Sequence, residues 1–403
     1  MTVNRPDVRA APPGDPGDFS FILGGPLFQL LRRGRLTGDA LELVQRRILV
    51  IAAVAWLPLL VLSALEGRLV GGAVTVPFLK DLEAHARFLI VVPLLVAAEI
   101  VVHQRVRFVA RQFVLRDLIP PHHRSRFDAA LASTMRLRNS IAAELVLIGV
   151  VYIVGVGVLW GRFLALDAST WYATPTVGGR TLSLAGVWFA WVSLPVMQFL
   201  LLRWYYRIFI WVRFLWQVSK LDLRLVATHP DRLGGLGFLS LTSTAFAPLA
   251  LAHGALVAAW IANRIFVDGA ALVDFKVEII GVTLLLLAVV FIPLMVFTGR
   301  LFEAWAEGEL TYGPLAERYA HEFEAKWMTP GGSTEPLLES GDVRSLAHMA
   351  NVYAVVQGMR FAPITRQALV TVVAATLAPI APLLLTMMPL GELVKRVVGV
   401  LAG

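Results

Sequence analysis

The chain has 403 residues, of which 57% are hydrophobic and 16% are charged, and its mean hydropathy is +0.71. A soluble domain carries about 25% charged residues, so this composition excludes an ordinary soluble protein and indicates an integral membrane protein. Cysteine is absent, which excludes disulfides, thiolate metal sites and a cysteine nucleophile. The formal net charge of +8 is typical of cationic residues retained beside anionic lipid heads, and no nucleic acid partner is expected.

The N-terminal region is expected to lie outside the membrane. Residues 1–20 are rich in proline, glycine and aspartate, which predicts a disordered tail. Residues 21–31 are apolar but too short to span, and arginines follow them, so an interfacial segment is expected there. The rest of the chain, 21–403, is predicted to form a single helical membrane domain. Its first apolar run begins at about Ile48 and precedes no small-residue cleavage site, which favours an uncleaved first span.

Seven apolar runs have about the 20-residue length that a helix needs to cross the hydrocarbon core. They are residues 48–65, 88–104, 141–161, 183–203, 240–262, 278–298 and 367–389. Pro379 and Pro382 interrupt the seventh run, so this span is expected to be broken. The predicted fold class is all-α, a polytopic membrane protein with long cytoplasmic helix extensions.

Lysine and arginine are distributed unequally between the two sides of the predicted membrane. With a cytoplasmic N-terminus, the inner segments are the leader, 104–140, 203–239 and 298–366, and they hold about three quarters of the 36 Lys and Arg residues. This bias predicts a cytoplasmic N-terminus and an external C-terminus, unless a half-span near Pro379 returns the chain to the cytoplasm. We expect a bacterial inner-membrane protein whose partners are lipids, anionic on the cytoplasmic side.

The fourth span is expected to continue far into the cytoplasm. Neither a proline after Pro195 nor a glycine before Gly234 interrupts it, so one helix is predicted from Ser183 to about Val226. Such a helix would be roughly 65 Å long. The stretch THPDRLGGLGFL, residues 228–239, then ends it and leads into the fifth span.

Two other spans have inner extensions. The second continues to Pro120 and the sixth to Pro314, and two short amphipathic helices are expected within 315–363. The C-terminal residues 391–403 are predicted to form an interfacial anchor.

Three prolines recur at a spacing of about 100 residues, as internal repeats of membrane proteins do. Pro93, Pro195 and Pro293 each lie in the second helix of a predicted membrane hairpin. Three parallel hairpin units would explain the spacing. Coincidence is the alternative, because prolines are common in membrane helices.

Six ionisable residues within or beside the spans are candidates for a pathway, because such groups are costly in a membrane. They are Glu99, His103, Glu144, His229, Asp231 and His253. The first five are expected in one layer at the cytoplasmic boundary. This layer could bind a divalent metal, relay protons or line an ion path, or pair with Arg105, Arg107 or Arg138 as a structural feature. His253 could serve a pathway, or bond a freed carbonyl or Thr244.

The HPDRLGG part of the stretch 228–239 has turn chemistry, with Asp231 able to bond local N–H groups and glycines that permit positive φ. It also resembles a phosphate cradle. Because no strand precedes it and no Lys-Ser/Thr pair ends it, nucleotide binding is excluded. A lipid phosphate held by Arg232 remains an alternative, and Arg203, Arg207 and Arg213 in the aromatic inner half of the fourth span are candidates to reach lipid phosphates.

Two stretches, HPDRLGGLGFL and GPLFQLLRRGRL, resemble stretches of uncharacterised bacterial multi-pass membrane proteins, a resemblance that implies no activity. In length, span number and orientation the chain is also similar in outline to insect gustatory and odorant receptor channels. Their inward-projecting helices form a cytoplasmic anchor. No motif residue matches theirs, so this similarity is a fold-level analogy.

The leading functional hypothesis is a pathway for an ion or small solute, and a homo-oligomer is consistent with it. A membrane sensor or scaffold that acts through its cytoplasmic helices is the alternative. A metal-dependent enzyme that acts on lipid through His229 and Asp231 is the third. No HExxH helix or nucleophile elbow occurs, which favours a protein that is not an enzyme, and no cofactor is expected. The sequence identifies neither the solute nor a metal.

Overall fold

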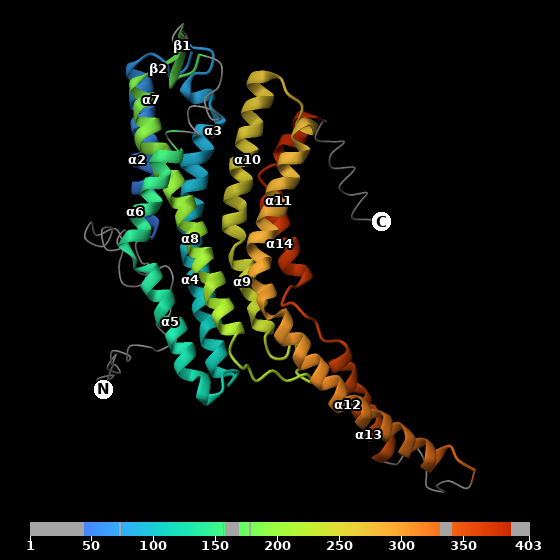
Figure 1. Cartoon of the computed structure of the whole chain (residues 1–403). Helices are drawn as coiled ribbons and strands as arrows, with labels where there is room; N and C mark the ends of the chain where they lie inside the picture. The colour runs from blue at the N-terminus through green and yellow to red at the C-terminus, as the bar shows by residue number, and fades with distance from the viewer. Residues whose placement is uncertain are drawn as a thin grey trace, which may run out of the picture.

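The computed structural model describes residues 44–71, 74–155, 157, 169–176, 179–330 and 341–387. Within them the protein is all-α apart from one β-hairpin, as predicted (Figure 1). Five described helices are long and apolar enough to cross a membrane, or six if one bent helix pair is a single span. The chain is therefore a multi-pass membrane protein. The predicted tail (1–20), interfacial segment (21–31) and C-terminal anchor (391–403) lie outside the described residues.

The elements follow one another in a simple order. The helices are α2 (Val44–Leu65), α3 (Leu82–His85), α4 (Val92–Leu115), α5 (Arg124–Arg138), α6 (Ile141–Val150), α7 (Leu184–Trp188), α8 (Leu194–Ser219), α9 (Ser240–Ala245), α10 (Ala247–Asp268), α11 (Lys276–Phe291), α12 (Thr298–Trp327), α13 (Gly341–Gln357) and α14 (Arg366–Leu377). The strands β1 (Ala173–Thr176) and β2 (Gly179–Leu182) pair antiparallel, with Ala173 opposite Leu182. Helices α5 and α6 belong to the bent pair, at 47° to each other.

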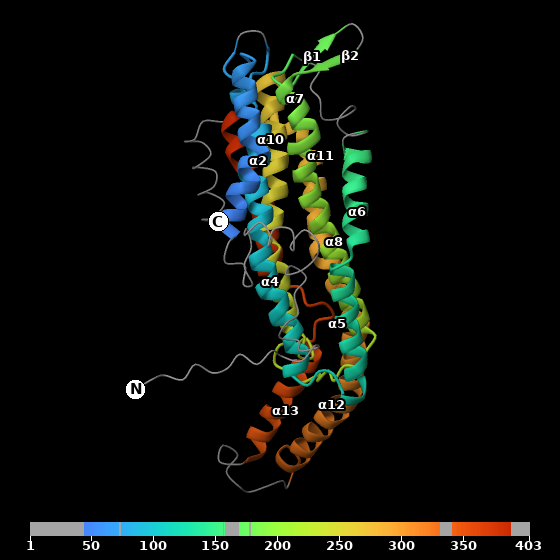
Figure 2. The same cartoon turned by 90° about the vertical axis from the view of Figure 1, so that its left-hand side faces the viewer.

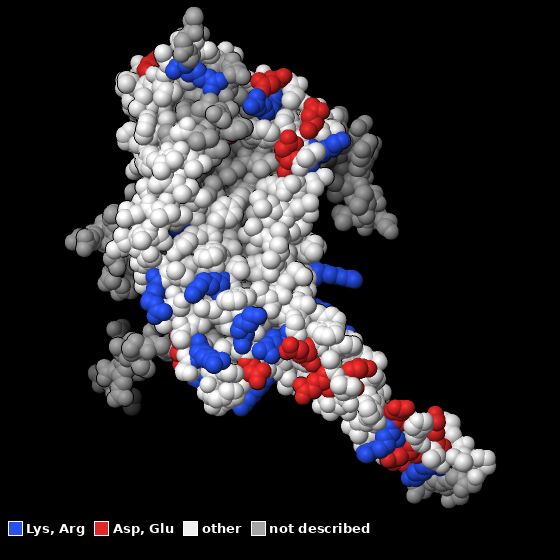
Figure 3. Space-filling model, viewed as in Figure 1, with Lys and Arg blue, Asp and Glu red and all other residues white. Residues whose placement is uncertain are grey.

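The described bundle has a different character at its two ends. The β-hairpin and α7 lie at one end, which we call the β-hairpin end, while α12 and α13 project from the other as a helical arm (Figures 1 and 2). Lysine and arginine side chains gather where the arm leaves the bundle, which we call the basic end (Figure 3). Between the ends, α2, α6 and α11 expose apolar residues such as Leu57, Leu145 and Leu284, at 49%, 62% and 60%. These faces are suited to lipid contact.

The seventh predicted span is not one membrane-crossing helix. Helix α14 has 12 residues, about 18 Å of helix, against a hydrocarbon core of about 30 Å. After Pro379 the chain continues as a 3₁₀-helix, Ala381–Thr386. The break follows from the prolines, as expected, because a proline has no N–H to continue the ladder. The predicted number of seven long spans is thereby reduced to five or six among the described residues.

The three recurring prolines share a local irregularity. A π-helix, Ala86–Val91, precedes Pro93, and another, Phe189–Ser193, precedes Pro195. A wider turn of this kind accommodates a proline, whose ring clashes with a regular α-helical carbonyl. Pro293 lies in a 3₁₀-helix, Ile292–Phe297. The larger hairpin repeat remains a prediction.

The fourth predicted helix ends earlier than expected. Helices α7 and α8 form a continuous run of 36 residues, Leu184–Ser219, about 54 Å long, rather than reaching Val226. Beyond it, Leu221 is buried and the backbone N–H of Arg224 donates to the carbonyl of Leu118. The chain therefore leaves the helix to pack against the end of α4, about ten residues before Pro230. Helix α12, by contrast, is longer than expected, because it passes through Pro314, where the sixth span was expected to stop.

Close packing of α10 and α14 depends on a glycine. A Cβ atom on Gly254 would lie 2.0 Å from the carbonyl oxygen of Thr376. Small residues allow membrane helices to approach in this way. A Cβ atom on Gly281 of α11, by contrast, would meet no described atom within 4 Å.

We therefore expect Gly254→Ala to lower the thermal stability of the purified protein, by about 1–3 kcal/mol, because α14 must move away. Gly281→Ala is the matched control and should leave the melting temperature unchanged or slightly raised. Equal melting temperatures for the two variants would show that α14 does not pack as described.

Candidate functional site

Five charged residues from four helices meet in the interior. We call them the ion-pair cluster: Arg47 of α2, Glu99 of α4, Glu144 of α6, and Arg203 and Arg207 of α8. Each is at most 9% exposed. Two of the six predicted candidates, Glu99 and Glu144, belong to it.

Glu99 is the centre of the ion-pair cluster. Arg47 donates to its Oε2, and Nη1 of Arg207 donates to its Oε1 at 2.7 Å. Arg203 is more loosely held, with Nη1 3.7 Å from Glu99 Oε1 and Nη2 3.7 Å from Glu144 Oε1. A carboxylate buried among three guanidinium groups is stable only while those partners remain.

The residues of the cluster lie at a similar depth in the bundle, because similar lengths of helix separate them from the β-hairpin end. Arg47 lies about 27 Å from Leu65 along α2, and Glu99 about 26 Å from Leu82 along α4. Arg203 lies about 29 Å from the start of α7. These lengths match the hydrocarbon core of a membrane, about 30 Å. The ion-pair cluster therefore lies near its boundary on the side of the basic end.

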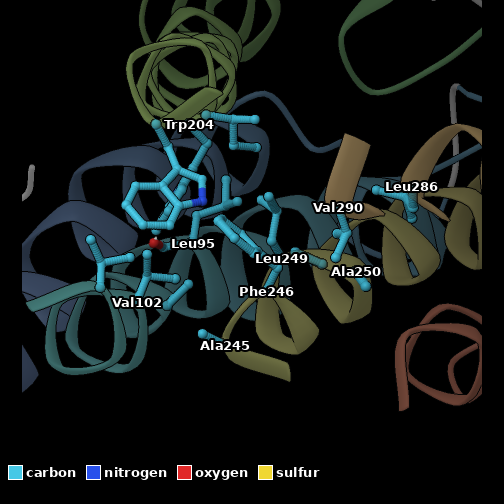
Figure 4. Close-up of a cluster of buried hydrophobic side chains, with 14 of the residues drawn as sticks. Leu95, Val102, Trp204, Ala245, Phe246, Leu249, Ala250, Leu286 and Val290 are labelled. Atoms are coloured by element: carbon cyan, nitrogen blue, oxygen red, sulfur yellow. Dashed lines mark hydrogen bonds between the residues drawn. The ribbon is translucent and has the colours of Figure 1, made fainter. Parts of the chain in front are cut away.

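An apolar wall separates the ion-pair cluster from α10 and α11. Trp204 is buried beside it and donates from Nε1 to the carbonyl oxygen of Leu95 at 2.9 Å. Phe246, Leu249 and Val290 continue this wall across the bundle (Figure 4). The cluster thus faces α2, α4 and α6, while the centre of the bundle at this level is closed by hydrocarbon side chains.

The cations around Glu99 are not those named in the structural alternative. That alternative paired Glu99 and Glu144 with Arg105, Arg107 or Arg138, whereas the ion pairs of Glu99 are made by Arg47, Arg203 and Arg207. Arg138 does lie beside Glu144, in the lining of a small crevice. Arg203 and Arg207, expected to point to lipid phosphates, lie inside the protein. Arg213 donates to Ser133 at 2.8 Å.

The predicted layer divides into two levels. His103 lies one turn beyond Glu99 on α4, where it is half-buried. The loop with His229 and Asp231 lies much further along, because Arg116, at the end of α4, donates to the carbonyl of Gly235 at 3.3 Å. Arg116 is about 26 Å beyond Glu99. His229 and Asp231 therefore belong to the basic end and not to the cluster.

Asp231 organises its own loop. Its Oδ1 accepts hydrogen bonds from the N–H groups of Leu233, at 2.8 Å, and Gly235, at 3.2 Å, and its Oδ2 accepts from Gly237 at 2.8 Å. Gly234 and Gly235 have φ of +61° and +99°, conformations that glycine adopts without strain. Partial burial alone would raise the pKa of Asp231, but the three backbone hydrogen bonds outweigh it and hold the pKa below its usual value.

The loop joins the bundle to the helical arm. The carbonyl of Arg232 accepts from the N–H of Arg360, at 2.8 Å, just beyond α13. Ala227 packs so closely against α12 that a Cβ on Gly308 would lie 2.4 Å from its Cβ. His229 Nδ1 is 2.9 Å from Asp231 Oδ1. The oxygens of the Asp231 carboxylate thus accept hydrogen bonds from the backbone of its own loop. Among the described residues, no three His, Asp or Glu side chains lie close enough together to hold a metal ion.

A second polar region lies between α8 and α10. A groove of about 300 Å³ is walled by Met197 and Gln198 of α8 and by Val257 and Trp260 of α10. Its polar lining includes Glu83 and Arg87, which form an ion pair with each other. Arg87 is 6% exposed. The groove lies toward the β-hairpin end of these helices.

His253 lies just beyond the inner end of this groove. It is one turn from Val257 on α10, and its Nε2 is 2.7 Å from the hydroxyl of Tyr205, which lies two turns from Gln198 on α8. His253 Nδ1 is 2.8 Å from the carbonyl oxygen of Leu249. Because a carbonyl only accepts, Nδ1 carries the proton, and in the neutral ring Tyr205 donates to Nε2. The hydrogen bond to a carbonyl was one of the two alternatives for His253.

Sequence reasoning missed Arg47 and the Glu83–Arg87 pair. Both have a sequence signal. Arg47 directly precedes the first apolar run, and Glu83 and Arg87 are spaced i, i+4 before the second. Gln198, a neutral polar residue inside the fourth run, was also overlooked.

Comparison with known proteins gives no relative. No family model matches the chain, no curated protein matches it, and no solved structure matches it.

The ion-pair cluster predicts a large effect of Glu99→Gln, because three buried guanidinium groups would lose their shared counter-charge. We expect a loss of about 3–5 kcal/mol, measured as a lower melting temperature in detergent. Glu278→Gln, at an exposed site on α11, is the control. Adding Arg47→Met to Glu99→Gln should recover part of the loss; a melting temperature of Glu99→Gln equal to that of the control would refute the cluster's structural role.

The lowered pKa of Asp231 predicts a pH dependence. Its carboxylate stabilises the fold above the usual aspartate pKa of about 3.9, and this contribution is lost as pH falls through the lower folded-state pKa. Asp231→Asn should therefore destabilise the protein at pH 7 by about 1–3 kcal/mol and make its melting temperature less sensitive to acid. Asp222→Asn, whose side chain is 71% exposed, should behave like the unmodified protein in the same pH series. Parallel pH profiles for all three proteins would contradict this role of Asp231.

Proposed function

We propose that the protein provides a pathway for an ion or small polar solute, entered from the β-hairpin end between α8 and α10. The observation that carries this proposal is the groove of about 300 Å³ in the half of the two helices toward the β-hairpin end, together with the Tyr205–His253 hydrogen bond about one turn beyond it. A recess between membrane helices that carries an ion pair in its wall, with a hydrogen bond between the two helices about one turn beyond it, suits a polar solute that enters from one side.

The lining of the groove supports a polar solute. Glu83 and Arg87 offer one charge of each sign, and both side chains are largely buried, at 13% and 8% exposure. Gln198 also lines the groove, and its Oε1 is turned toward Gly155, where a Cβ atom would lie 2.1 Å from it. Ionisable and polar groups held in this way inside a membrane protein commonly mark the path of a substrate.

Tyr205 and His253 have the position of a gate. At this level α8 and α10 are not closely packed helices, and a hydrogen bond of 2.7 Å between the two side chains joins them. Breaking one hydrogen bond is a modest cost, about 0.5–1.5 kcal/mol net. Beyond the pair lies the apolar wall of Phe246 and Leu249, so opening requires a movement of the helices as well.

The basic end is proposed to face the cytoplasm. The bias of lysine and arginine toward the segments at this end supports that orientation. The β-hairpin end, and with it the groove, then faces the opposite compartment. Of the predicted pathway residues, His253 is the one at the groove, while Glu99 and Glu144 hold helices together.

The absence of native cysteine makes accessibility measurable with single-cysteine variants. We expect Gln198→Cys and Val257→Cys to react with a membrane-impermeant thiol reagent added on the side of the β-hairpin end. Leu284→Cys, on the lipid-facing surface of α11, is the control and should stay unreactive. If the groove positions react no faster than Leu284→Cys, the groove contains no water and the pathway proposal fails.

The gate is tested in the same system with Val212→Cys, which lies two turns beyond Tyr205 on the same face of α8. This cysteine should be protected from the reagent, and adding Tyr205→Phe should increase its reaction rate several-fold by removing the hydrogen bond. An unchanged rate would argue against the Tyr205–His253 pair as a gate.

The helical arm favours a second candidate, a docking platform for a basic partner. Helix α12 extends about 45 Å, and one of its faces exposes Glu303, Glu307, Glu317 and Glu324 together with Leu310, at 80%. An acidic face with an apolar centre complements a basic amphipathic segment. A photo-crosslinker at position 310 should capture such a partner in cells. The charge-reversed variant Glu317→Lys with Glu324→Lys should lose it, and capture that survives charge reversal would contradict the proposed complementarity.

A further inference from the structure

The ion-pair cluster contains a buried cation whose hydrogen-bonding capacity is unused. Arg203 is 7% exposed, and its guanidinium donates no hydrogen bond to any residue that the structure describes. Its nearest carboxylate oxygens, on Glu99 and Glu144, are both 3.7 Å away, beyond hydrogen-bond range. Five N–H donors of a buried guanidinium normally find acceptors. A ligand that accepts hydrogen bonds would satisfy these donors.

A crevice lies beside Arg203. It is lined by Arg138, Glu144, Leu147, Arg203, Tyr206 and Arg207, and its volume is about 10 Å³. That is room for one water-sized atom. One anionic oxygen could enter it from the mouth while the rest of its group stays outside.

The local charge favours an anion over water. The ion-pair cluster has three arginines and two glutamates, which leaves one positive charge in excess among its members. This excess lies in a region of low dielectric, where an unbalanced charge is costly. Arginine also presents a planar fork that matches the oxygens of a phosphate.

The position of the crevice favours a lipid as the source of that anion. The ion-pair cluster lies near the membrane boundary at the basic end, at the depth of lipid headgroups. Leu147 in the crevice lies on α6, where the neighbouring Leu145 and Val146 are 62% and 64% exposed. An acyl chain could lie against this apolar face while its phosphate reaches the crevice.

We propose that this crevice binds a phosphate oxygen of an anionic phospholipid, with Arg203 as the principal donor. The lipid supplies the counter-charge missing from the ion-pair cluster and links α6 to α8. This site is separate from the groove between α8 and α10, and its occupancy does not depend on the pathway proposal.

The test is a lipid titration of the delipidated, purified protein, followed by its melting temperature. Phosphatidylglycerol should raise the melting temperature with a half-maximal concentration that increases about tenfold in Arg203→Met, since a charge-assisted hydrogen bond is lost. Arg105→Gln, at an exposed arginine of α4, is the matched control for general attraction to anionic lipid and should titrate like the unmodified protein. An Arg203→Met response equal to that of the unmodified protein would overturn the proposal.

A second variant covers the case in which Arg203→Met does not fold. Leu147→Glu leaves the ion-pair cluster intact and adds a carboxylate at the crevice, so it should weaken the phosphatidylglycerol response to a similar extent. Inorganic phosphate and glycerol phosphate distinguish the source: full stabilisation by either soluble anion would overturn the assignment to a lipid. If Leu147→Glu and the unmodified protein respond alike to every anion, the crevice holds water alone and the proposal is wrong.

Discussion

The structure depends on keeping one carboxylate charged inside a membrane protein. Glu99 is 3% exposed, and a carboxylate in such surroundings requires cations at close range. Those cations come from α2 and α8, which brings three helices to one level, and Arg203 extends the connection to Glu144 on α6. A network of this kind contributes less to net stability than to specificity: it tolerates one rotation and one depth of each helix, because a shifted helix would leave a buried charge unpaired.

The length of helix α4 places the ion-pair cluster and the loop of Asp231 at different levels of the molecule. Helix α4 continues about 26 Å beyond Glu99 before Arg116 meets the loop of Asp231. The ion-pair cluster therefore stays at the membrane boundary while the HPDRLGG loop lies at the root of the helical arm. The glycines of that loop serve a backbone turn around one carboxylate, and the turn holds the chain where α12 and the end of α13 meet it. The loop is a joint between membrane and arm.

Helix α8 is the element that both polar regions share. Arg203 and Arg207 lie on one face of it, and Tyr205 lies on the opposite face toward α10. Trp204 and the apolar wall keep the two faces apart. As a result the charged network can remain fixed while the side facing α10 changes, an arrangement suited to a pathway whose moving part is a neutral hydrogen bond rather than a buried ion pair.

Much of this architecture is determined by the sequence alone. Composition and apolar run length predict a polytopic all-α membrane protein, the paired prolines predict the broken last span, and Asp231 among glycines predicts its turn, because these features depend on local chemistry. Only the tertiary structure decided which charged residues pair with one another. Arg47 is 52 residues from Glu99 and Arg207 is 108 residues away, so their meeting depends on the rotation and depth of separate helices, which no local pattern encodes. The same reason explains why α8 ends at Ser219: the residues that follow gain contacts with the end of α4, a neighbour that is distant in the chain.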